Sequence, residues 1–239
     1  MTRQNRHDQD RALTVVQPMS DNDTEQTAHL HITHLPAGFF PQLGHRFVRR
    51  WHQTFIDCPT GVALVIRDAD GRVAAFLLGT IDQHAYVRHV LNHDRLALAS
   101  RGIVGLVAHP IVAKRFFRTR ARPYARRLAR QTLPTFRSRT TASQRSVGSR
   151  RRVPVSGPIG VVHAVVTDPA ARRAGYGRML LSQFESELAA AGTPLGQLVT
   201  RVDGNAAEFY GRLGWRETAR LVNRDGQKII QFHRVVNLQ

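Results

Sequence analysis

The sequence has one cysteine, almost no lysine and no uninterrupted apolar run of membrane-spanning length. Cys58 is the single cysteine among its 239 residues. One cysteine excludes an internal disulfide framework and is typical of a reducing compartment. The most apolar stretch, residues 96–113, contains Arg101, His109 and Pro110, so it does not predict a bilayer-spanning helix. The start of the chain also lacks the apolar core of a secretory signal. We therefore expect a cytoplasmic protein.

Acidic residues are absent from one long stretch, and this makes the charge uneven. The formal net charge is +18, yet sixteen arginines and lysines and no Asp or Glu lie between Arg95 and Thr167. The rest of the chain is therefore close to neutral. Of the 35 basic residues, only Lys114 and Lys228 are lysines and the others are arginines. Genome composition explains this preference for arginine as well as a functional role does. Charge of this density attracts anions, which leaves nucleic acid, acidic lipid and phosphorylated ligands open as partners.

The composition predicts one domain with a leader and an insertion. Residues 1–26 are polar and without periodicity, which favours a disordered N-terminal leader, and residues 27–239 form a single domain. Residues 83–157 form a basic insertion that we expect to be largely helical. Its last part, 131–157, is rich in Ser, Thr and Arg and is predicted to be a mobile loop.

Hydrophobic periodicity predicts a mixed α/β order of elements outside the insertion. A stripe of large apolar residues from Phe40 to Phe55 recurs at helical spacing, and Asp68 to Gly71 predicts a hairpin turn. Two glycine-flanked apolar runs near the C-terminus predict a second hairpin that turns at Asp225–Gly226. The expected elements are strand 28–35, helix 40–55, hairpin 62–81, strand 159–167, helix 176–191, strand 196–202, helix 205–214 and hairpin 216–236.

The connection between the fourth strand and the following helix indicates an anion site. Its sequence, TDPAARRAGYG, places Arg172 and Arg173 just before a helix that begins near Gly175. The first N–H groups of a helix have no partner within it and carry a partial positive charge, and Gly175 and Gly177 allow an anion to approach the backbone. The alternative is that the glycines only shape a tight turn and the arginines face solvent. Neither a three-glycine dinucleotide motif nor a G-x-x-x-x-G-K-[ST] loop is present.

These residues, together with a second motif downstream, resemble the GCN5-related N-acetyltransferase (GNAT) superfamily. Residues 172–177 match its acetyl-CoA signature [RQ]-x-x-G-x-[GA], and 167–169 match its V-x-P strand exit with Thr in place of Val. Residues 203–215 match N-x-x-A-x-x-[FL]-Y-x-x-x-G-[FW] from the alanine onward. The usual asparagine position holds Asp203, so the corresponding contact to the cofactor would fall to Asn205.

The resemblance implies an acyl-CoA N-acyltransferase fold, with helices on both faces of a mixed central sheet that splays beside the cofactor strand. It implies acetyl-CoA as co-substrate, with the pantetheine arm lying along residues 159–167. The pyrophosphate would be bound by the N–H groups of residues 173–177. The cofactor-binding residues implied are Val165, Val166, Thr167, Arg172, Arg173, Ala174, Gly175, Tyr176, Gly177, Asn205 and Tyr210.

The resemblance also implies two catalytic residues. Tyr210 aligns with the tyrosine that many members use to protonate the departing thiolate, although it could instead pack in the core beside Phe209 and Trp215. His163 has a suitable ordinary pKa for a general base, and histidine occupies the matching place in serotonin N-acetyltransferase. Strand alternation would place it on one face with Val165 and Thr167. The alternative is a buried histidine bonded to a backbone carbonyl.

The activity implied is direct transfer of an acetyl group to a primary amine of a small molecule in a ternary complex. A protein acyltransferase or an acyl-carrier-protein-dependent enzyme that docks through the basic insertion is an alternative, as is a non-catalytic anion or nucleic-acid binding module. Nucleic acid is not expected, because no such motif is visible. No metal is expected, although His89 and His93 are four residues apart. Contact of the insertion with a membrane surface or an acidic protein, and a homodimer, stay open.

Overall fold

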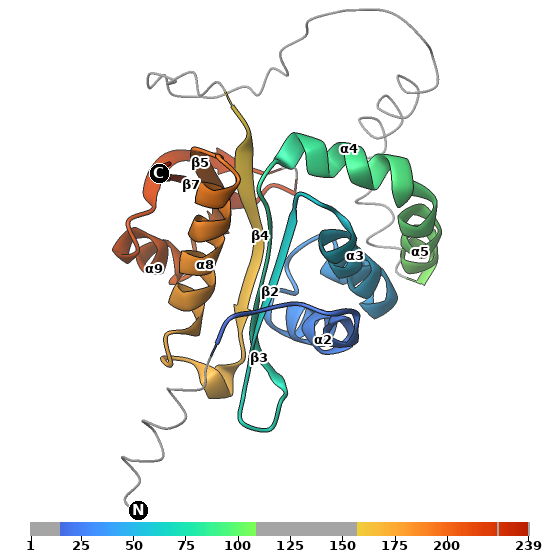
Figure 1. Cartoon of the computed structure of the whole chain (residues 1–239). Helices are drawn as coiled ribbons and strands as arrows, with labels where there is room; N and C mark the ends of the chain where they lie inside the picture. Colours follow the sequence, from blue (N-terminus) through green and yellow to red (C-terminus); the bar gives the residue numbers. More distant parts are fainter. Residues whose placement is uncertain (1–14, 109–156, 224, 239) are drawn as a thin grey trace, which may run out of the picture.

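The computed structural model describes residues 15–108, 157–223 and 225–238, which form one seven-stranded mixed sheet (Figure 1). The strand order is β1-β2-β3-β4-β5-β7-β6, and the β4–β5 pair is parallel while the other pairs are antiparallel. The mixed α/β class expected from the sequence is therefore confirmed. The strands are β1 (Gln17–Pro18), β2 (Gly61–Arg67), β3 (Val73–Thr80), β4 (Ile159–Thr167), β5 (Leu195–Arg201), β6 (Arg216–Val222) and β7 (Lys228–Val235).

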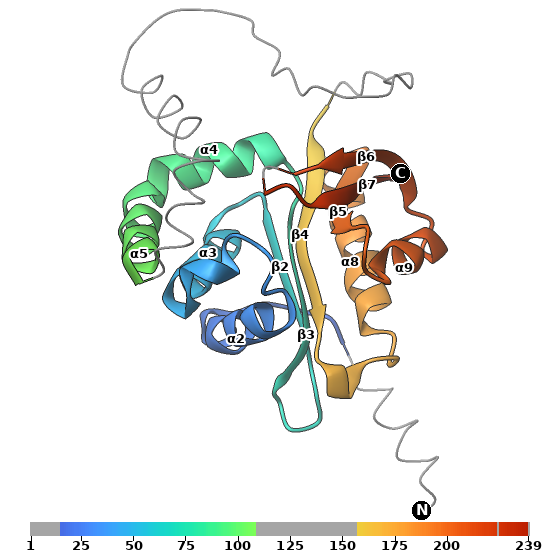
Figure 2. The same cartoon turned by 180° about the vertical axis from the view of Figure 1, so that it is seen from behind.

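Helices cover both faces of the sheet, as Figures 1 and 2 show from opposite sides. Helices α8 and α9 lie on one face, here called the α8 face. Helices α2 and α3 lie on the other, here called the α3 face, and α4 and α5 continue on that side. The helices are α2 (Thr24–His34), α3 (His45–Asp57), α4 (Gln83–His93), α5 (Arg95–Ala108), α8 (Tyr176–Ala190) and α9 (Ala206–Arg212), with short 3-10 turns at Asp21–Asp23, Pro41–Leu43 and Pro169–Ala171.

Strand β3 lies at the centre of the molecule and separates two apolar cores. Every residue of β3 is buried, which is typical of a strand covered on both faces. Phe76 and Leu78 pack into the core beneath α2 and α3, whereas Ala75 and Leu77 pack into the core beneath α8. Successive side chains of β3 thus point alternately into the two cores. The side chains of β4 are likewise divided between these two cores.

The sequence prediction of a strand at residues 28–35 is wrong, because this segment belongs to helix α2. Four of its five buried residues, Thr24, Thr27, Ala28 and His31, follow the i, i+3, i+4, i+7 spacing of one helix face. Three of the four are polar, so a pattern based on apolar residues does not reveal the helical period. The alternation of Ala28, Leu30 and Ile32 (spaced two apart) favoured a strand instead.

The folded part also begins earlier than the predicted end of the leader at residue 26. Strand β1 pairs with β2 through Gln17 and Pro18, and the buried carboxylate of Asp23 forms an ion pair with Arg67 of β2. The Arg67 hydrogen bond counteracts the cost of burying the carboxylate, and the pKa of Asp23 is lowered. The rest of the predicted leader, residues 1–14, lies outside the described residues.

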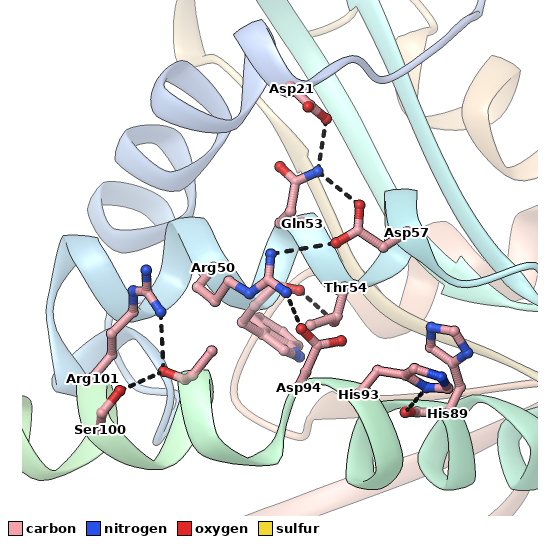
Figure 3. A network of polar contacts seen from close by, with 12 residues as sticks. Asp21, Arg50, Gln53, Thr54, Asp57, His89, His93, Asp94, Ser100 and Arg101 are labelled. Atoms are coloured by element: carbon pink, nitrogen blue, oxygen red, sulfur yellow. Dashed lines mark hydrogen bonds and ion pairs between the residues drawn. The ribbon is translucent and has the colours of Figure 1, made fainter.

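The first part of the predicted insertion is helical, as expected, and docks on α3. Asp94, which is 1% exposed, lies between α4 and α5 and forms an ion pair with Arg50 of α3, while Arg50 also contacts Asp57 at 3.3 Å (Figure 3). Breaking a buried pair by removing one partner is costly, so this contact fixes the two helices against the domain. The predicted mobile loop at 131–157 falls almost wholly outside the described residues.

The remaining predicted elements agree with the structure. The hairpins form β2–β3 and β6–β7, the strands form β4 and β5, and the helices form α3, α8 and α9. One difference is that Gly44, at φ +89°, separates Pro41–Leu43 from α3, so Phe40 precedes the helix and packs its ring on Trp51 at 4.7 Å. Within the described part of the chain, no helix has both the length and the apolarity to cross a bilayer.

Candidate active site

Strands β4 and β5 pair at one end only and then separate. Their parallel pairing is recorded from Ile159–Leu195 to Val161–Gln197, and not beyond it within the described residues. Strand β4 continues to Thr167, paired with β3, and β5 continues to Arg201, paired with β7. Each strand therefore has an inner edge whose backbone polar groups lack a strand partner. An extended chain entering this opening could take up those hydrogen bonds.

A β-bulge at His163 marks the point where the two strands separate. In the β3–β4 register Leu78 pairs with Ala164 and Gly79 with Val162, so His163 is the extra residue. The bulge places His163 and Ala164 on the same face, where the ring of His163 contacts α3 and Ala164 joins the α3-face core. Val165 packs against the α8-face core instead.

The expectation that His163, Val165 and Thr167 share one face is therefore wrong. Strict alternation would have placed them together, but the extra residue shifts the phase of the strand by one. His163 faces α3, whereas Thr167, two residues beyond Val165, faces the α8 side with it. Val166 is buried in the α3-face core. The three residues expected to bind the cofactor on this strand, Val165, Val166 and Thr167, thus point to both faces of the sheet.

The ring of His163 lies in an aromatic environment with one polar partner. Its centroid is 5.1 Å from Phe55, 5.7 Å from Tyr86 and 6.4 Å from Trp51. Its Nε2 lies 2.9 Å from Oε1 of Gln83. Burial among these rings disfavours the charged imidazolium and lowers the pKa of His163 to about 4. The ring is therefore neutral at pH 7 and has one nitrogen free to accept a proton.

The connection from β4 to α8 and the first turn of that helix contain the residues of the predicted anion site, and residues 173–178 are here called the 173–178 loop. Asp168 organises its start, because Oδ1 accepts a hydrogen bond of 2.8 Å from the N–H of Ala170. Gly175 adopts φ +85° at the N-cap of α8, and Arg173 adopts φ +67°, an uncommon conformation for a residue with a side chain. Both are exposed, as are Arg172 and Ala174.

The N–H groups of this loop have no acceptor recorded within the described chain. The first hydrogen bond of α8 is from the N–H of Met179 to the carbonyl of Gly175, at 3.1 Å. The N–H groups of residues 176–178 precede it and so cannot be paired within the helix. No side-chain cap from Gly175 is available to satisfy them. This exposed set of donors, with the helix dipole and two arginines, can bind a phosphate group.

Tyr210, the second predicted catalytic residue, lies on α9 among aromatic rings. Its centroid is 5.3 Å from Phe209, 5.9 Å from Phe232 and 6.5 Å from Trp215. Burial raises the pKa of Tyr210 to about 12, so the phenol stays protonated. No hydrogen bond of its hydroxyl is recorded among the described residues, which leaves that proton free for a ligand.

Asp203 and Asn205 lie between β5 and α9 and are both exposed. Asp203, at the position where the resembling family has asparagine, forms an ion pair with Arg201. The hydrogen bond from Arg201 lowers the pKa of Asp203, which keeps it ionised. Asn205 is the N-cap of α9 and makes no side-chain cap hydrogen bond. Its amide is therefore not used to cap this helix.

The structure brings the two sequence motifs into contact. Gly177 of α8 faces the ring of Phe209 of α9, so the 173–178 loop and the helix of Tyr210 lie side by side. The sequence prediction missed Gln83, and it named Phe209 only as a core neighbour of Tyr210. The only local signal for Gln83 was its place after Asp82, which caps α4. The rings of His89 and His93 stack at 4.3 Å, but no group of three metal-ligating residues occurs in the described ranges.

Comparisons with known proteins give one family and a set of related folds. Residues 138–235 match the model of an acetyltransferase (GNAT) domain. No curated protein matches the chain. Among solved structures, an N-acetyltransferase from Staphylococcus aureus Mu50 is 10% identical with a TM-score of 0.55, covering 94% of this chain and 99% of its own. NAA60 of Arabidopsis thaliana, solved in complex with acetyl-CoA, is 11% identical with a TM-score of 0.54, covering 93% and 98%.

A third structure, Ard1 of Thermoplasma volcanium, is 15% identical with a TM-score of 0.53, covering 94% of this chain and 98% of its own. At these identities the structural likeness shows the fold, while the domain match concerns residues 138–235 alone. Residues 138–235 therefore match a GNAT acetyltransferase domain, and the described part of the chain has the fold of these solved structures.

Proposed function

We propose that the chain is an acyl-CoA-dependent N-acetyltransferase that transfers acetyl from acetyl-CoA to a primary amine of a small molecule. The observation that carries this proposal is the juxtaposition of two features. The unpaired edges of β4 and β5 open beside the 173–178 loop, whose N–H groups lack partners. One ligand that needs both is a pyrophosphate joined to an extended arm with amide groups, which is the structure of coenzyme A.

In this proposal the main chain of Val165, Val166 and Thr167 binds the arm, and the N–H groups of residues 173–177 bind the pyrophosphate. Arg172, Arg173 and Asn205 add side-chain contacts from the exposed rim of the site. Tyr176 and Gly177, in the first turn of α8, complete it. These positions remain a proposal, supported by the free donors and the separated strands.

The transfer needs two protons moved by the chain. The acceptor nitrogen attacks the acetyl carbonyl, forms the new C–N bond and gives up a proton to His163, which is neutral at pH 7. The C–S bond then breaks, and the thiolate takes a proton from Tyr210, whose raised pKa keeps that proton available. Direct attack by the amine requires no covalent enzyme intermediate, and the single cysteine, Cys58, is buried in the α3-face core.

The cofactor site is tested by placing a charge in the 173–178 loop. Ala174 is exposed, so Ala174→Asp and Ala174→Asn differ mainly in one negative charge. A carboxylate next to the N-terminus of α8 stabilises the helix but repels a pyrophosphate. We expect Ala174→Asp to weaken acetyl-CoA binding by roughly tenfold or more, and less so at high salt. Ala174→Asn should stay within about threefold of the parent.

Binding is measured by calorimetry and by thermal shift. Ligand at about 100 times Kd adds roughly 2.7 kcal/mol to the folded state, which gives a visible rise in Tm. Acetyl-pantetheine, which lacks the pyrophosphate, should bind much more weakly than acetyl-CoA. Equal affinity of the two Ala174 variants for acetyl-CoA would contradict the assignment of the loop. An amine panel with acetyl-CoA then tests transfer, and absence of any product would leave a binding module.

A further inference from the structure

His163 is bonded to a residue that lies eighty positions earlier in the chain. Nε2 of His163 lies 2.9 Å from Oε1 of Gln83, the first residue of α4. Asp82 fixes this turn, because its Oδ1 accepts hydrogen bonds of 2.8 and 3.0 Å from the N–H groups of His84 and Ala85. The segment between β3 and β4 thus brings a carboxamide to the β4 bulge at the end of the strand opening.

With Oε1 of Gln83 facing the ring, this contact indicates which ring nitrogen of His163 carries the proton. A carboxamide oxygen can only accept a hydrogen bond, so Nε2 must be the donor. Nδ1 then holds the lone pair and is the nitrogen that can take up a proton. In the other tautomer the carboxamide would have to turn over, so that its NH2 group instead of its oxygen faces Nε2.

The other groups around His163 do not select a tautomer. Trp51 and Phe55 of α3 present ring surfaces, and the titratable group facing the imidazole is Tyr86 of α4. The Tyr86 hydroxyl lies 2.7 Å from Oγ1 of Thr54, and burial raises its pKa, so it stays neutral. Gln83 is therefore the polar contact recorded for the ring within the described residues.

We propose that Gln83 is a positioning residue that holds the proton of His163 on Nε2 and so presents Nδ1 to the acceptor amine. The proposal rests on the role of His163 in the proposed function. It assigns a part in catalysis to the segment inserted between β3 and β4, through the first turn of α4.

The tautomer is read directly by nitrogen NMR of the His163 ring, without any substrate. In the parent we expect Nε2 protonated and Nδ1 bare at pH 7. Gln83→Leu removes the acceptor and should produce a mixture of tautomers or the Nδ1-protonated form. His84→Leu, an equally apolar change at an exposed site on the same turn, should leave the spectrum as in the parent. A parent ring protonated on Nδ1 would overturn the proposal.

A second variant keeps the acceptor and adds charge, so the test does not depend on Gln83→Leu folding well. Gln83→Glu still accepts from Nε2, and its carboxylate should raise the pKa of His163 from about 4 by roughly one to three pH units. The acid limb of kcat/KM that belongs to His163 should move by the same amount. Gln83→Leu should lower kcat/KM by roughly tenfold or more, with little change in the Kd of acetyl-CoA.

The outcomes separate this proposal from the function on which it rests. If neither the NMR titration nor the pH profile moves in Gln83→Glu, Gln83 does not position His163. If the titration moves and the profile does not, His163 is not the base and the catalytic role of Gln83 fails with it. The Ala174 variants test the cofactor site independently of either result, and only equal affinity of Ala174→Asp and Ala174→Asn for acetyl-CoA would count against that site.

Discussion

Gly177 and Phe209 lie in direct contact, and this contact joins the two motifs of the sequence. A Cβ added to Gly177 would lie 3.0 Å from Cζ of Phe209, which is tighter than nearly all real contacts of this kind. Gly177 does not have a positive φ, so its backbone conformation alone does not call for glycine. The packing of α9 against the first turn of α8 therefore explains this glycine at least as well as an anion does.

The first prediction follows from this contact. Alanine is favoured over glycine in a helix by about 1 kcal/mol, but in the parent the Phe209 ring opposes the added methyl group. Gly177→Ala should therefore be neutral or destabilising in the parent and stabilising in a Phe209→Leu background. Urea unfolding of the four proteins should give a coupling of roughly 1 kcal/mol between the two sites. Additive effects would mean that the ring does not limit the size of residue 177.

The elements whose apolar residues follow one clear period were predictable from the sequence. In α8 the buried residues Leu180, Leu181, Phe184 and Leu188 are all apolar, and the helix was predicted to within one residue. Helix α2 was not, because three of its buried positions carry polar groups. Thr27 and His31 are paired through His52, a partner on α3 that the local sequence does not reveal.

The candidate site was predictable where it depends on local backbone and not where it depends on register. The 173–178 loop was found because glycine and arginine at a helix start have a local meaning. The face of His163 was not, because the bulge follows from pairing with β3, and no glycine or proline in β4 beside His163 signals it. The contact with Gln83 depends on that face and so was missed as well.

A second prediction isolates the backbone conformation at the N-cap of α8. A Cβ at Gly175 or at Gly211 would meet nothing within 4 Å, but only Gly175 has a positive φ. Gly175→Ala should cost about 1–2 kcal/mol of stability, because an L-residue is strained in that region. Gly211→Ala, inside α9, should instead add up to about 1 kcal/mol. Thermal or urea unfolding gives both values, and a neutral Gly175→Ala would show that the loop adopts another conformation.

A third prediction concerns the phenol of Tyr210. If it protonates the leaving thiolate, Tyr210→Phe should lower kcat by roughly a hundredfold and leave the Kd of acetyl-CoA unchanged. Because burial raises the pKa of Tyr210 to about 12, this residue should produce no basic limb in kcat between pH 7 and 10. The variant should fold as well as the parent, since the lost hydroxyl has no recorded partner in the described chain. Unchanged kcat would place Tyr210 in the core alone.

The last prediction is a loss of stability in mild acid caused by buried histidines of the α3-face core. Thr27, His52 and His31 form a hydrogen-bonded chain, with 2.9 Å between Thr27 Oγ1 and His52 Nδ1 and 3.0 Å between His52 Nε2 and His31 Nδ1. Burial lowers the pKa of His31 to about 4 and that of His52 well below its ordinary value. Both rings are thus neutral in the folded protein at pH 5, while in the unfolded chain they are charged.

Because the unfolded chain binds these protons near pH 6.5, stability is complete above that pH and falls as the pH drops toward 4. The contribution of His31 is on the order of 3 kcal/mol across this window. Urea unfolding at several pH values gives the slope of the unfolding free energy against pH, which reports the number of protons taken up on unfolding. In His31→Gln this number should fall by about one. His84→Gln, on an exposed position of α4, is the matched control and should keep the parent slope. Asp23 does not obscure the result, because its pKa is lowered in the folded protein and its protonation therefore falls below the range in which the histidines titrate. A parent whose stability is flat from pH 6.5 to 4.5 would show that the Thr27–His52–His31 chain is open to water.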